Sequence, residues 1–183
     1  LAMRRSTTVS FPEYDRDEVL TNFPALVVLN AKTSGFSYEF FQSLEGHDLR
    51  FTDAAGTTAL NHEIETWNPA GTSYVWVQVP EFSSNCAVRA SWGNVLDMDR
   101  PACATNGATW SNNFRGVWHC NPVRADSSPY AAKTTSVLSN DYLRGPVGNH
   151  AVRCGLASAR LLVTETNQLS VSDNFTYSFW AKT

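Results

Sequence analysis

The chain has 183 residues, enough for one large domain or two small ones that each bury a core. Its 14 basic and 17 acidic side chains give a formal net charge of −3, which argues against a broad nucleic-acid-binding surface. Charged residues make up only 17% of the chain and aromatic residues 12%, a balance that favours a β-rich extracellular protein over a cytosolic enzyme.

The sequence contains no apolar run approaching the roughly 20 residues that a membrane-spanning helix needs. The first residues, Leu1–Arg5, lack the apolar core of a signal peptide. We therefore expect no membrane span. We also expect that the protein is secreted or displayed at the cell surface, with any export signal upstream of this sequence.

Alternation of apolar and polar residues between turn signals predicts short strands in the first half of the chain. Residues 36–44 are predicted as a short helix or an irregular loop, and Pro24 is expected to mark the start of the second strand. Short strands at intervals of about 8–12 residues favour an antiparallel β-sandwich. The predicted strands are Arg5–Phe11, Ala25–Asn30, Leu49–Phe51, His62–Trp67, Tyr74–Val79 and Cys86–Trp92.

A change in composition divides the chain. Acidic residues outnumber basic ones over residues 1–95, and the reverse holds over residues 96–183. Residues 96–114, rich in Asn, Gly, Ala and Thr, are predicted as a linker between a first domain (1–95) and a second domain (115–183). Strands predicted in the second domain are Arg115–Cys120, His150–Cys154, Arg160–Thr164 and Asn174–Lys182.

Several segments between residues 3 and 94 occur in a familiar order. They are Asn22–Pro24, His47–Asp53, His62–Trp67, Val75–Pro80 and Trp92–Asn94. In this order they resemble a bacterial domain of unknown function that is found in exported surface proteins and beside proton-channel proteins of the MotA/TolQ/ExbB kind. The resemblance implies a bacterial surface protein.

Gly116–Cys120, Val147–Gly155 and Ser172–Trp180 resemble strands of a concanavalin-like, laminin-G-type jelly roll. Roughly 70 residues cannot close a jelly roll of about eight strands. The resemblance therefore implies an incomplete jelly roll over residues 115–183. Either the chain continues beyond it, or another chain adds strands at an open sheet edge, which would cause self-association.

The four cysteines lack the close pairs of a zinc site. Their even number predicts two disulfides in an oxidising compartment, and four buried thiols are the alternative. In a jelly roll of the kind resembled, Cys120 and Cys154 would replace core residues on neighbouring strands. The resemblance thus implies the pair Cys120–Cys154, leaving Cys86–Cys103 to tie the linker to the first domain.

The segment His62–Trp67 is the first candidate for sugar recognition. In a regular strand Glu63, Glu65 and Trp67 share one face, and Arg50 could lie opposite one of the carboxylates. Sugar C–H groups stack on aromatic rings while carboxylates and guanidinium groups bind hydroxyls. The alternative is a cross-strand ion pair with Trp67 covering the edge of the sheet.

A second candidate row consists of Tyr74, Trp76 and Gln78, which alternate with three valines. Two aromatic residues at positions i and i+2 stand about 7 Å apart on one face of a sheet, a spacing suited to a glycan chain. The alternative is that a second sheet packs on this row and makes it part of the core.

The pair Glu63 and Glu65 resembles the carboxylate strand of jelly-roll endoglucanases of the laminarinase class. Retaining glycosidases need two carboxylates about 5–5.5 Å apart, but the third carboxylate of that motif is missing here, because Trp67 and two further non-acidic residues follow. The sequence also contains no Gly-x-Ser-x-Gly motif and no histidine pair at i, i+4. We therefore expect no catalytic activity.

No cofactor is predicted, although aspartates could supply oxygen ligands to calcium, and the metal-binding residues stay unassigned. The candidate ligands are Asp48, Asp53, Asp97 and Asp99. The sequence as a whole predicts a non-catalytic extracellular carbohydrate-binding or adhesion module whose partner is a glycan or a surface protein, with no nucleic acid. The alternatives are a structural or spacer subunit that binds protein by strand addition, and an accessory module of a longer polysaccharide-degrading enzyme.

Overall fold

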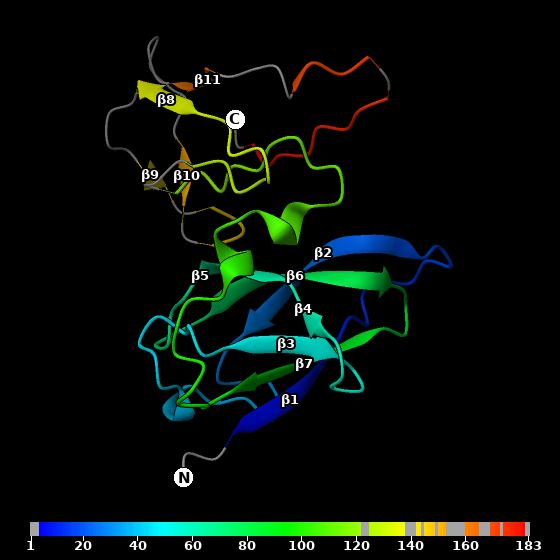
Figure 1. Cartoon of the computed structure of the whole chain (residues 1–183), viewed down its shortest axis with the longest axis vertical. Helices are drawn as coiled ribbons and strands as arrows, with labels where there is room; N and C mark the ends of the chain where they lie inside the picture. The colour runs from blue at the N-terminus through cyan, green and yellow to red at the C-terminus, as the bar shows by residue number, and fades with distance from the viewer. Residues whose placement is uncertain are drawn as a thin grey trace. The chain divides into compact units, whose positions relative to one another are not determined.

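The alternating segments of the chain fold into antiparallel β-sheets. The computed structural model describes residues 4–121, 125–137, 142–143, 145–148, 150–152, 160–164, 169–172 and 174–181. The chain divides into two units, Leu1–Asn113 and Phe114–Thr183. Figure 1 shows the strands of both units.

Two antiparallel sheets face each other in the first unit (Figure 1). The four-stranded sheet has, in spatial order, β1 (Arg5–Ser10), β7 (Ala87–Trp92), β3 (Arg50–Asp53) and β4 (Ala59–Leu60). The three-stranded sheet has β2 (Leu20–Leu29), β6 (Ser73–Phe82) and β5 (His62–Thr66). This arrangement confirms the predicted antiparallel β-sandwich.

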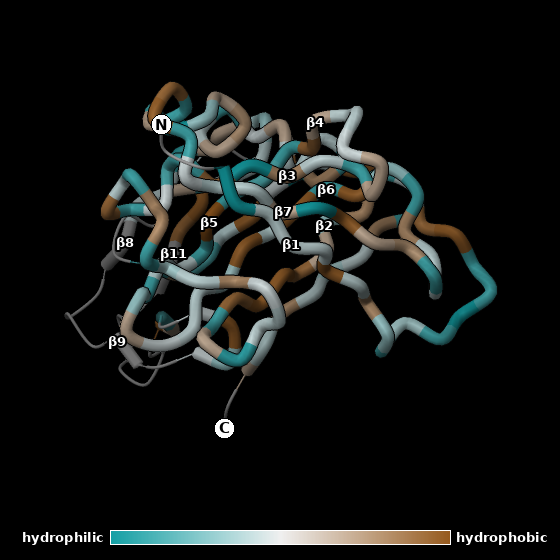
Figure 2. The backbone as a smooth tube through the Cα atoms, turned by 90° about the horizontal axis from the view of Figure 1, so that it is seen from below, coloured by the Kyte–Doolittle hydropathy of each residue, from teal (hydrophilic) through white to brown (hydrophobic). Residues whose placement is uncertain are grey.

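The core lies between the two sheets. Along β6, Val75, Val77 and Val79 are buried, while the intervening Tyr74 and Trp76 are only partly buried, so the predicted alternation of this strand is confirmed. In Figure 2 hydrophobic stretches are concentrated in the strands. The residues that the other elements add to the core include Ala25, Val27, Leu29, Phe36, Leu49, Phe51, Leu60, Val88, Ala90 and Trp92.

The second strand begins earlier than the sequence predicts. It starts at Leu20 rather than Ala25, and Pro24 lies inside it, in register with Gln78. A proline cannot donate a hydrogen bond to a neighbouring strand, but β2 has a neighbour on one side only. An edge position therefore tolerates Pro24, and proline is a poor marker of where this strand starts.

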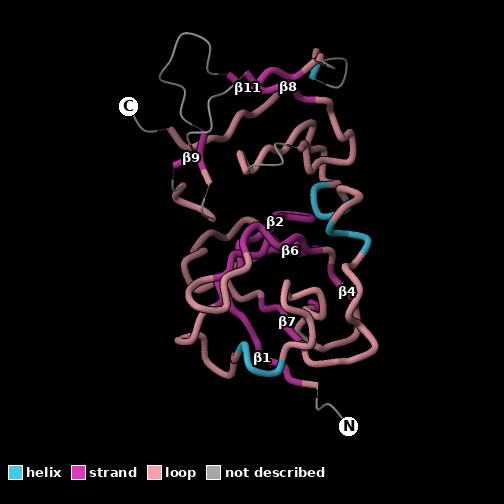
Figure 3. Tube along the Cα trace, turned by 90° about the vertical axis from the view of Figure 1, so that its left-hand side faces the viewer, coloured by secondary structure: helices cyan, strands magenta, loops and turns pink. Residues whose placement is uncertain are grey.

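Helical structure in the described residues is limited to single 3-10 turns (Figure 3). In the first unit these are η1 (Tyr38–Phe40), inside the segment predicted as a short helix or loop, η2 (Ala102–Ala104) and η3 (Ala108–Trp110). Within the described ranges, no helix is long and apolar enough to cross a membrane.

The segment interpreted from sequence as a linker differs in the structure: up to Asn113 it belongs to the first unit. Thr109 is fully buried and Trp110 is 4% exposed, and both η2 and η3 contact β5. The burial of these side chains holds the segment on the sheet. Its many small and polar residues therefore do not indicate a flexible connection.

The second unit contains two short antiparallel ladders. In one, β8 (Thr134–Val137) pairs with β11 (Arg160–Val163), and in the other β9 (Tyr142–Leu143) pairs with β10 (Ala151–Val152). They confirm the antiparallel β class of this half. The jelly-roll arrangement stays a prediction.

Two predicted strands of the second unit do not form as expected. The segment 115–120 contributes an isolated bridge from Trp118 to Asp126, whose buried carboxylate accepts hydrogen bonds from the backbone of Val117, Ser128 and Ala132. Residues 174–181 form no strand and are exposed throughout. Alternation of side chains alone does not make a strand where no neighbouring strand supplies hydrogen bonds.

The predicted disulfide Cys86–Cys103 is wrong. Cys86 precedes β7 and packs against the core of the sandwich, whereas the Cys103 thiol on η2 contacts His62 of β5. Cys86 therefore lies beside the four-stranded sheet, whereas Cys103 lies against a strand of the three-stranded sheet. No disulfide occurs among the described residues, and the predicted pair Cys120–Cys154 includes Cys154, which lies outside them.

Candidate functional site

A register irregularity in β5 decides which side chains face outward from the three-stranded sheet. Glu63 pairs with Trp76 and Thr66 pairs with Tyr74, so Glu65 is an extra residue between the two pairs. Cross-strand partners point to the same side of a sheet. Glu63 and Thr66 therefore share the outer face with Trp76 and Tyr74.

Beyond this bulge, the alternation places Trp67 on the inner side of the sheet, opposite to the sequence prediction. Its ring packs edge-on against Tyr38 and Phe41, with centroids 5.2 and 4.8 Å away. A Cβ added to Gly46 would lie 2.6 Å from the Trp67 ring, which shows how closely the backbone covers it. Trp67 therefore packs against the core and is not part of the candidate sugar site.

Arg50 is not part of the candidate sugar site either. It lies on β3 of the four-stranded sheet, whereas Glu63 and Glu65 lie on β5 of the other sheet. The Arg50 guanidinium donates hydrogen bonds to the backbone carbonyls of His47, Leu49 (2.9 Å), Asp97 (2.9 Å) and Asp99 (3.2 Å). The side chain therefore fastens the loop after β7 instead of facing a carboxylate.

The remaining carboxylates bind indole groups. Glu65 accepts a hydrogen bond from Nε1 of Trp76 at 2.9 Å, and Glu63 accepts one from Nε1 of Trp110 at 2.6 Å. The rings of Trp76 and Trp110 are 5.4 Å apart at an angle of 60°. Two tryptophans and two glutamates thus form one cluster on the outer face, which we call the indole–carboxylate cluster.

Sequence reasoning missed Trp110 because it lies in the segment interpreted as a linker. A tryptophan is rare in a flexible polar linker, so its presence was the signal in the sequence that this segment packs against the domain. Trp110 and its neighbours cover one end of the outer face: Gln78, 7% exposed, binds Asn61 (3.0 Å) and Ser111 (2.9 Å).

Of the seven predicted site residues, the structure brings five together on the outer face of the three-stranded sheet. Glu63 and Gln78 are buried under the 108–111 segment, and Tyr74, Trp76 and Glu65 remain partly exposed. The accessible part of the candidate site is therefore a row of two aromatic rings with one carboxylate beside them.

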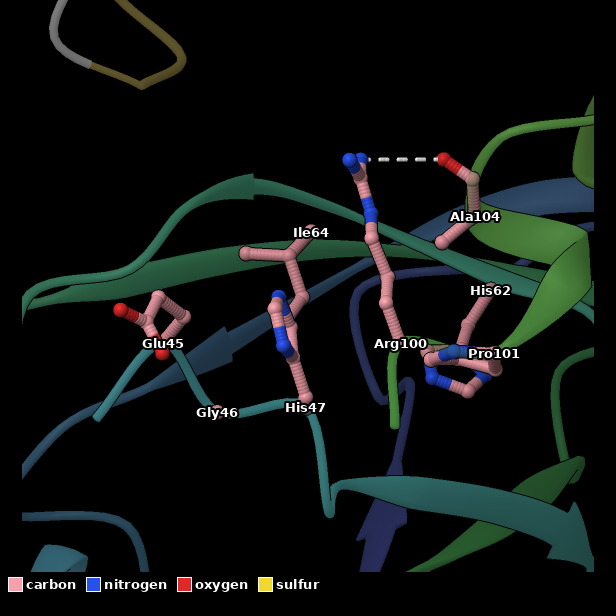
Figure 4. Close-up of a pocket in the computed structure, with 8 residues that line it drawn as sticks. All are labelled: Glu45, Gly46, His47, His62, Ile64, Arg100, Pro101 and Ala104. Atoms are coloured by element: carbon pink, nitrogen blue, oxygen red, sulfur yellow. Dashed lines mark hydrogen bonds between the residues drawn. The ribbon is translucent and has the colours of Figure 1, made fainter. Parts of the chain in front are cut away.

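A separate small pocket opens on the other side of β5 (Figure 4). Its volume is about 160 Å³. In Figure 4 the His47 ring lies between Glu45 and the Arg100 side chain, whose guanidinium donates to the Ala104 carbonyl at 3.1 Å. The lining residues are Glu45, Gly46, His47, His62, Ile64, Arg100, Pro101 and Ala104.

Within this pocket His62 is held neutral. Burial disfavours the charged imidazolium and lowers the pKa of His62 to about 4, and its Nδ1 lies 3.4 Å from the Leu60 carbonyl oxygen. The Cys103 thiol contacts the backbone of His62 and lies 3.9 Å from Nδ1. These contacts hold η2 on β5. In the described part of the chain, no three side chains of the metal-binding types gather into a group.

Three of the four aspartates considered for calcium, Asp48, Asp53 and Asp97, have carboxylates that accept hydrogen bonds from the protein. The carboxylate of Asp48, 1% exposed, accepts from the backbone N–H groups of Gln42 (3.0 Å), Ser43 (3.1 Å) and Gly93 (2.9 Å). Hydrogen bonds from its own turn lower the pKa of the Asp53 carboxyl. Asp48 therefore joins two loops of the first unit, which accounts for its burial without a metal.

Residues 45–99 match the family model described as a domain of unknown function, DUF2341. The match runs from the loop before β3 to the loop after β7, and so includes most of the outer face and of the pocket. It supports the resemblance to an unknown-function domain, while the laminin-G-like part and the proton-channel context stay predictions. No curated protein and no solved structure matches the chain.

Proposed function

We propose that this chain is a non-catalytic extracellular module that binds glycans on the outer face of its three-stranded sheet. The observation that supports this function is the pair Tyr74 and Trp76, two partly exposed aromatic side chains on one face of β6. Strand geometry separates residues i and i+2 by about 7 Å, so the two rings offer adjacent stacking surfaces.

The Trp76 ring is held in a fixed orientation. Its Nε1–H donates to Glu65 and its centroid lies 5.4 Å from that of the Trp110 ring, so little side-chain freedom is left to lose when a ligand stacks on it. A carboxylate can accept more than one hydrogen bond, which suits Glu65 to bind a sugar hydroxyl beside the ring. A preorganised aromatic surface with a neighbouring acceptor is the arrangement that sugar recognition requires.

A second candidate function is protein binding by a structural or adhesive module. It is favoured by Phe175, Tyr177, Phe179 and Trp180, which are 61%, 76%, 80% and 80% exposed. Exposed aromatic side chains so close together in the chain are typical of surfaces that contact another molecule. This candidate places the binding surface in the second unit, so the two functions predict different effects of mutations in β6.

The test is a glycan array probed with the soluble protein, followed by Tyr74→Ala and Trp76→Ala. Each substitution removes one stacking surface and should weaken the binding of a positive glycan by about 1–3 kcal/mol. Phe40→Ala is the control, because Phe40 is an exposed aromatic residue (38%) on η1 whose ring lies against the guanidinium of Arg5, on β1 of the other sheet. An array without a binding glycan, or unchanged binding by both β6 variants, would refute the proposal.

A further inference from the structure

The outer face of the four-stranded sheet carries a groove of different chemistry. Strand pairing places Arg89 between Thr8 and Thr52, and Ser91 beside Ser6. The groove has a volume of about 260 Å³. Its lining residues are Arg4, Ser6, Thr52, Gly56, Arg89 and Ser91, so two guanidinium groups and three hydroxyl groups gather there and no carboxylate lines it.

Serine hydroxyls orient both guanidinium groups. Arg4 Nη2 donates to Ser91 Oγ at 2.9 Å, and Arg89 Nη2 donates to Ser6 Oγ at 2.8 Å. Within the described residues, neither arginine lies within ion-pair distance of a carboxylate. A guanidinium carries five N–H donors, so each of these groups retains donors after its bond to serine. The groove therefore presents two oriented positive charges that the described protein does not neutralise.

We propose that this groove binds an oxyanion, the sulfate or carboxylate group of an acidic polysaccharide. The planar fork of arginine matches the paired oxygens of such groups, and neighbouring hydroxyls add further donors. The chain as a whole carries a net charge of −3, so attraction of an anionic polymer to the groove depends on the local arrangement of the two arginines and not on the overall charge. That the ligand is a polysaccharide rests on the proposed function, whereas the oxyanion site itself does not.

The groove can be tested separately from the aromatic row, because the two lie on the outer faces of different sheets. Dextran, dextran sulfate and carboxymethyl dextran share one neutral backbone, so calorimetric titration with the three polymers at low ionic strength isolates the charged group. We expect dextran sulfate or carboxymethyl dextran to bind more tightly than dextran, and the preferred polymer identifies the oxyanion.

Arg89→Gln should weaken binding of the preferred polymer by about tenfold, since it removes one charge-assisted contact, and the double substitution with Arg4→Gln should weaken it further. Arg89→Lys should have an intermediate effect, because it keeps the charge and loses the planar fork. The matched control is Arg16→Gln: Arg16 is 79% exposed beside Asp15, and its loss removes the same charge away from the groove. Binding should then change by about twofold or less.

Inorganic sulfate provides an independent readout. Backbone amide NMR signals of Ser6, Arg89 and Ser91 should shift on titration of the unmodified protein and stay still in the double variant. Two results would contradict the proposed oxyanion site. One is that Arg16→Gln and Arg89→Gln weaken polymer binding equally, and the other is that sulfate shifts amide signals other than those of these three residues. If these results hold while Tyr74→Ala and Trp76→Ala leave glycan binding unchanged, the oxyanion site stands and the aromatic glycan site fails.

Discussion

Trp76 lies on β6 and Trp67 directly follows the neighbouring strand β5, and the two side chains lie on opposite sides of the three-stranded sheet. Trp67 faces inward, where Tyr38 and Phe41 pack on its ring. Trp76 faces outward, where Glu65 binds its indole N–H. The single extra residue in β5 separates the two environments, because a shift of one residue moves every later side chain of a strand to the other face.

The two sides of the sheet serve different purposes. Inner side chains contribute to the free energy of unfolding through burial, whereas outer side chains are held in place by hydrogen bonds and stay partly accessible to a ligand. Substitutions on the inner side should therefore change stability most, and those on the outer side should change binding most. The predictions below test this difference from the largest expected effect to the smallest.

Trp67→Ala should destabilise the first unit by about 3–5 kcal/mol, because it removes a large ring from a packed aromatic group and leaves a cavity. The measurement is denaturant unfolding followed by circular dichroism. Tyr74→Ala, on the outer face, serves as the control and should cost less than about 1 kcal/mol. If the two substitutions destabilise the protein equally, the bulge does not divide the sheet in the way described.

The sequence was sufficient to predict which side chains of a regular strand share a face. Val75, Val77 and Val79 alternate with Tyr74 and Trp76, and this pattern separated the two faces of β6, although it left open whether a second sheet covers the aromatic face. It was insufficient for β5, because the residues from His62 to Trp67 alternate just as regularly and nothing in them indicates a bulge. The extra residue is defined by pairing with β6, which is a tertiary property.

The candidate site was predicted in part for the same reason. The carboxylates and aromatic residues of the outer face were found from alternation, but the partner of Glu63 was not, since Trp110 lies 47 residues away in a segment of polar composition. The predicted pair Cys86–Cys103 failed for a related reason: an even count predicts disulfides only if the fold brings the thiols together, and Cys103 lies against His62 instead.

The free energy of unfolding should also depend on pH, through His62 on the inner side of the sheet. Burial lowers the pKa of His62 from 6.5 to about 4, so between these values the unfolded chain binds a proton that the folded protein does not. The stabilising contribution is complete above about pH 6.5 and is lost as the pH falls toward 4. The difference in pKa corresponds to a loss of about 3 kcal/mol over this interval.

Denaturant unfolding at several pH values measures this loss, and His62→Gln should flatten the dependence whatever its effect on absolute stability. An NMR titration of the His62 ring checks the cause directly. Protonation of the ring near pH 6.5 in the folded protein would show that the imidazole is solvated and that burial does not lower its pKa. Asp53, whose pKa is also lowered, contributes mainly below about pH 4, where its carboxyl is protonated in the unfolded chain but not in the folded protein.

The smallest effect is expected from Glu65→Gln on the outer face. The amide oxygen of glutamine can still accept the hydrogen bond from Trp76 Nε1, so only the charge of the acceptor is lost and the free energy of unfolding should fall by about 0.5 kcal/mol. The Trp76 indole N–H resonance should nevertheless move upfield, because a neutral acceptor polarises the N–H less. If Glu65 also binds the sugar, glycan affinity should fall by more than stability does. An indole resonance that stays unchanged in Glu65→Gln would mean that the carboxylate does not orient Trp76, and the outer face would then lack the preorganised ring on which sugar binding depends.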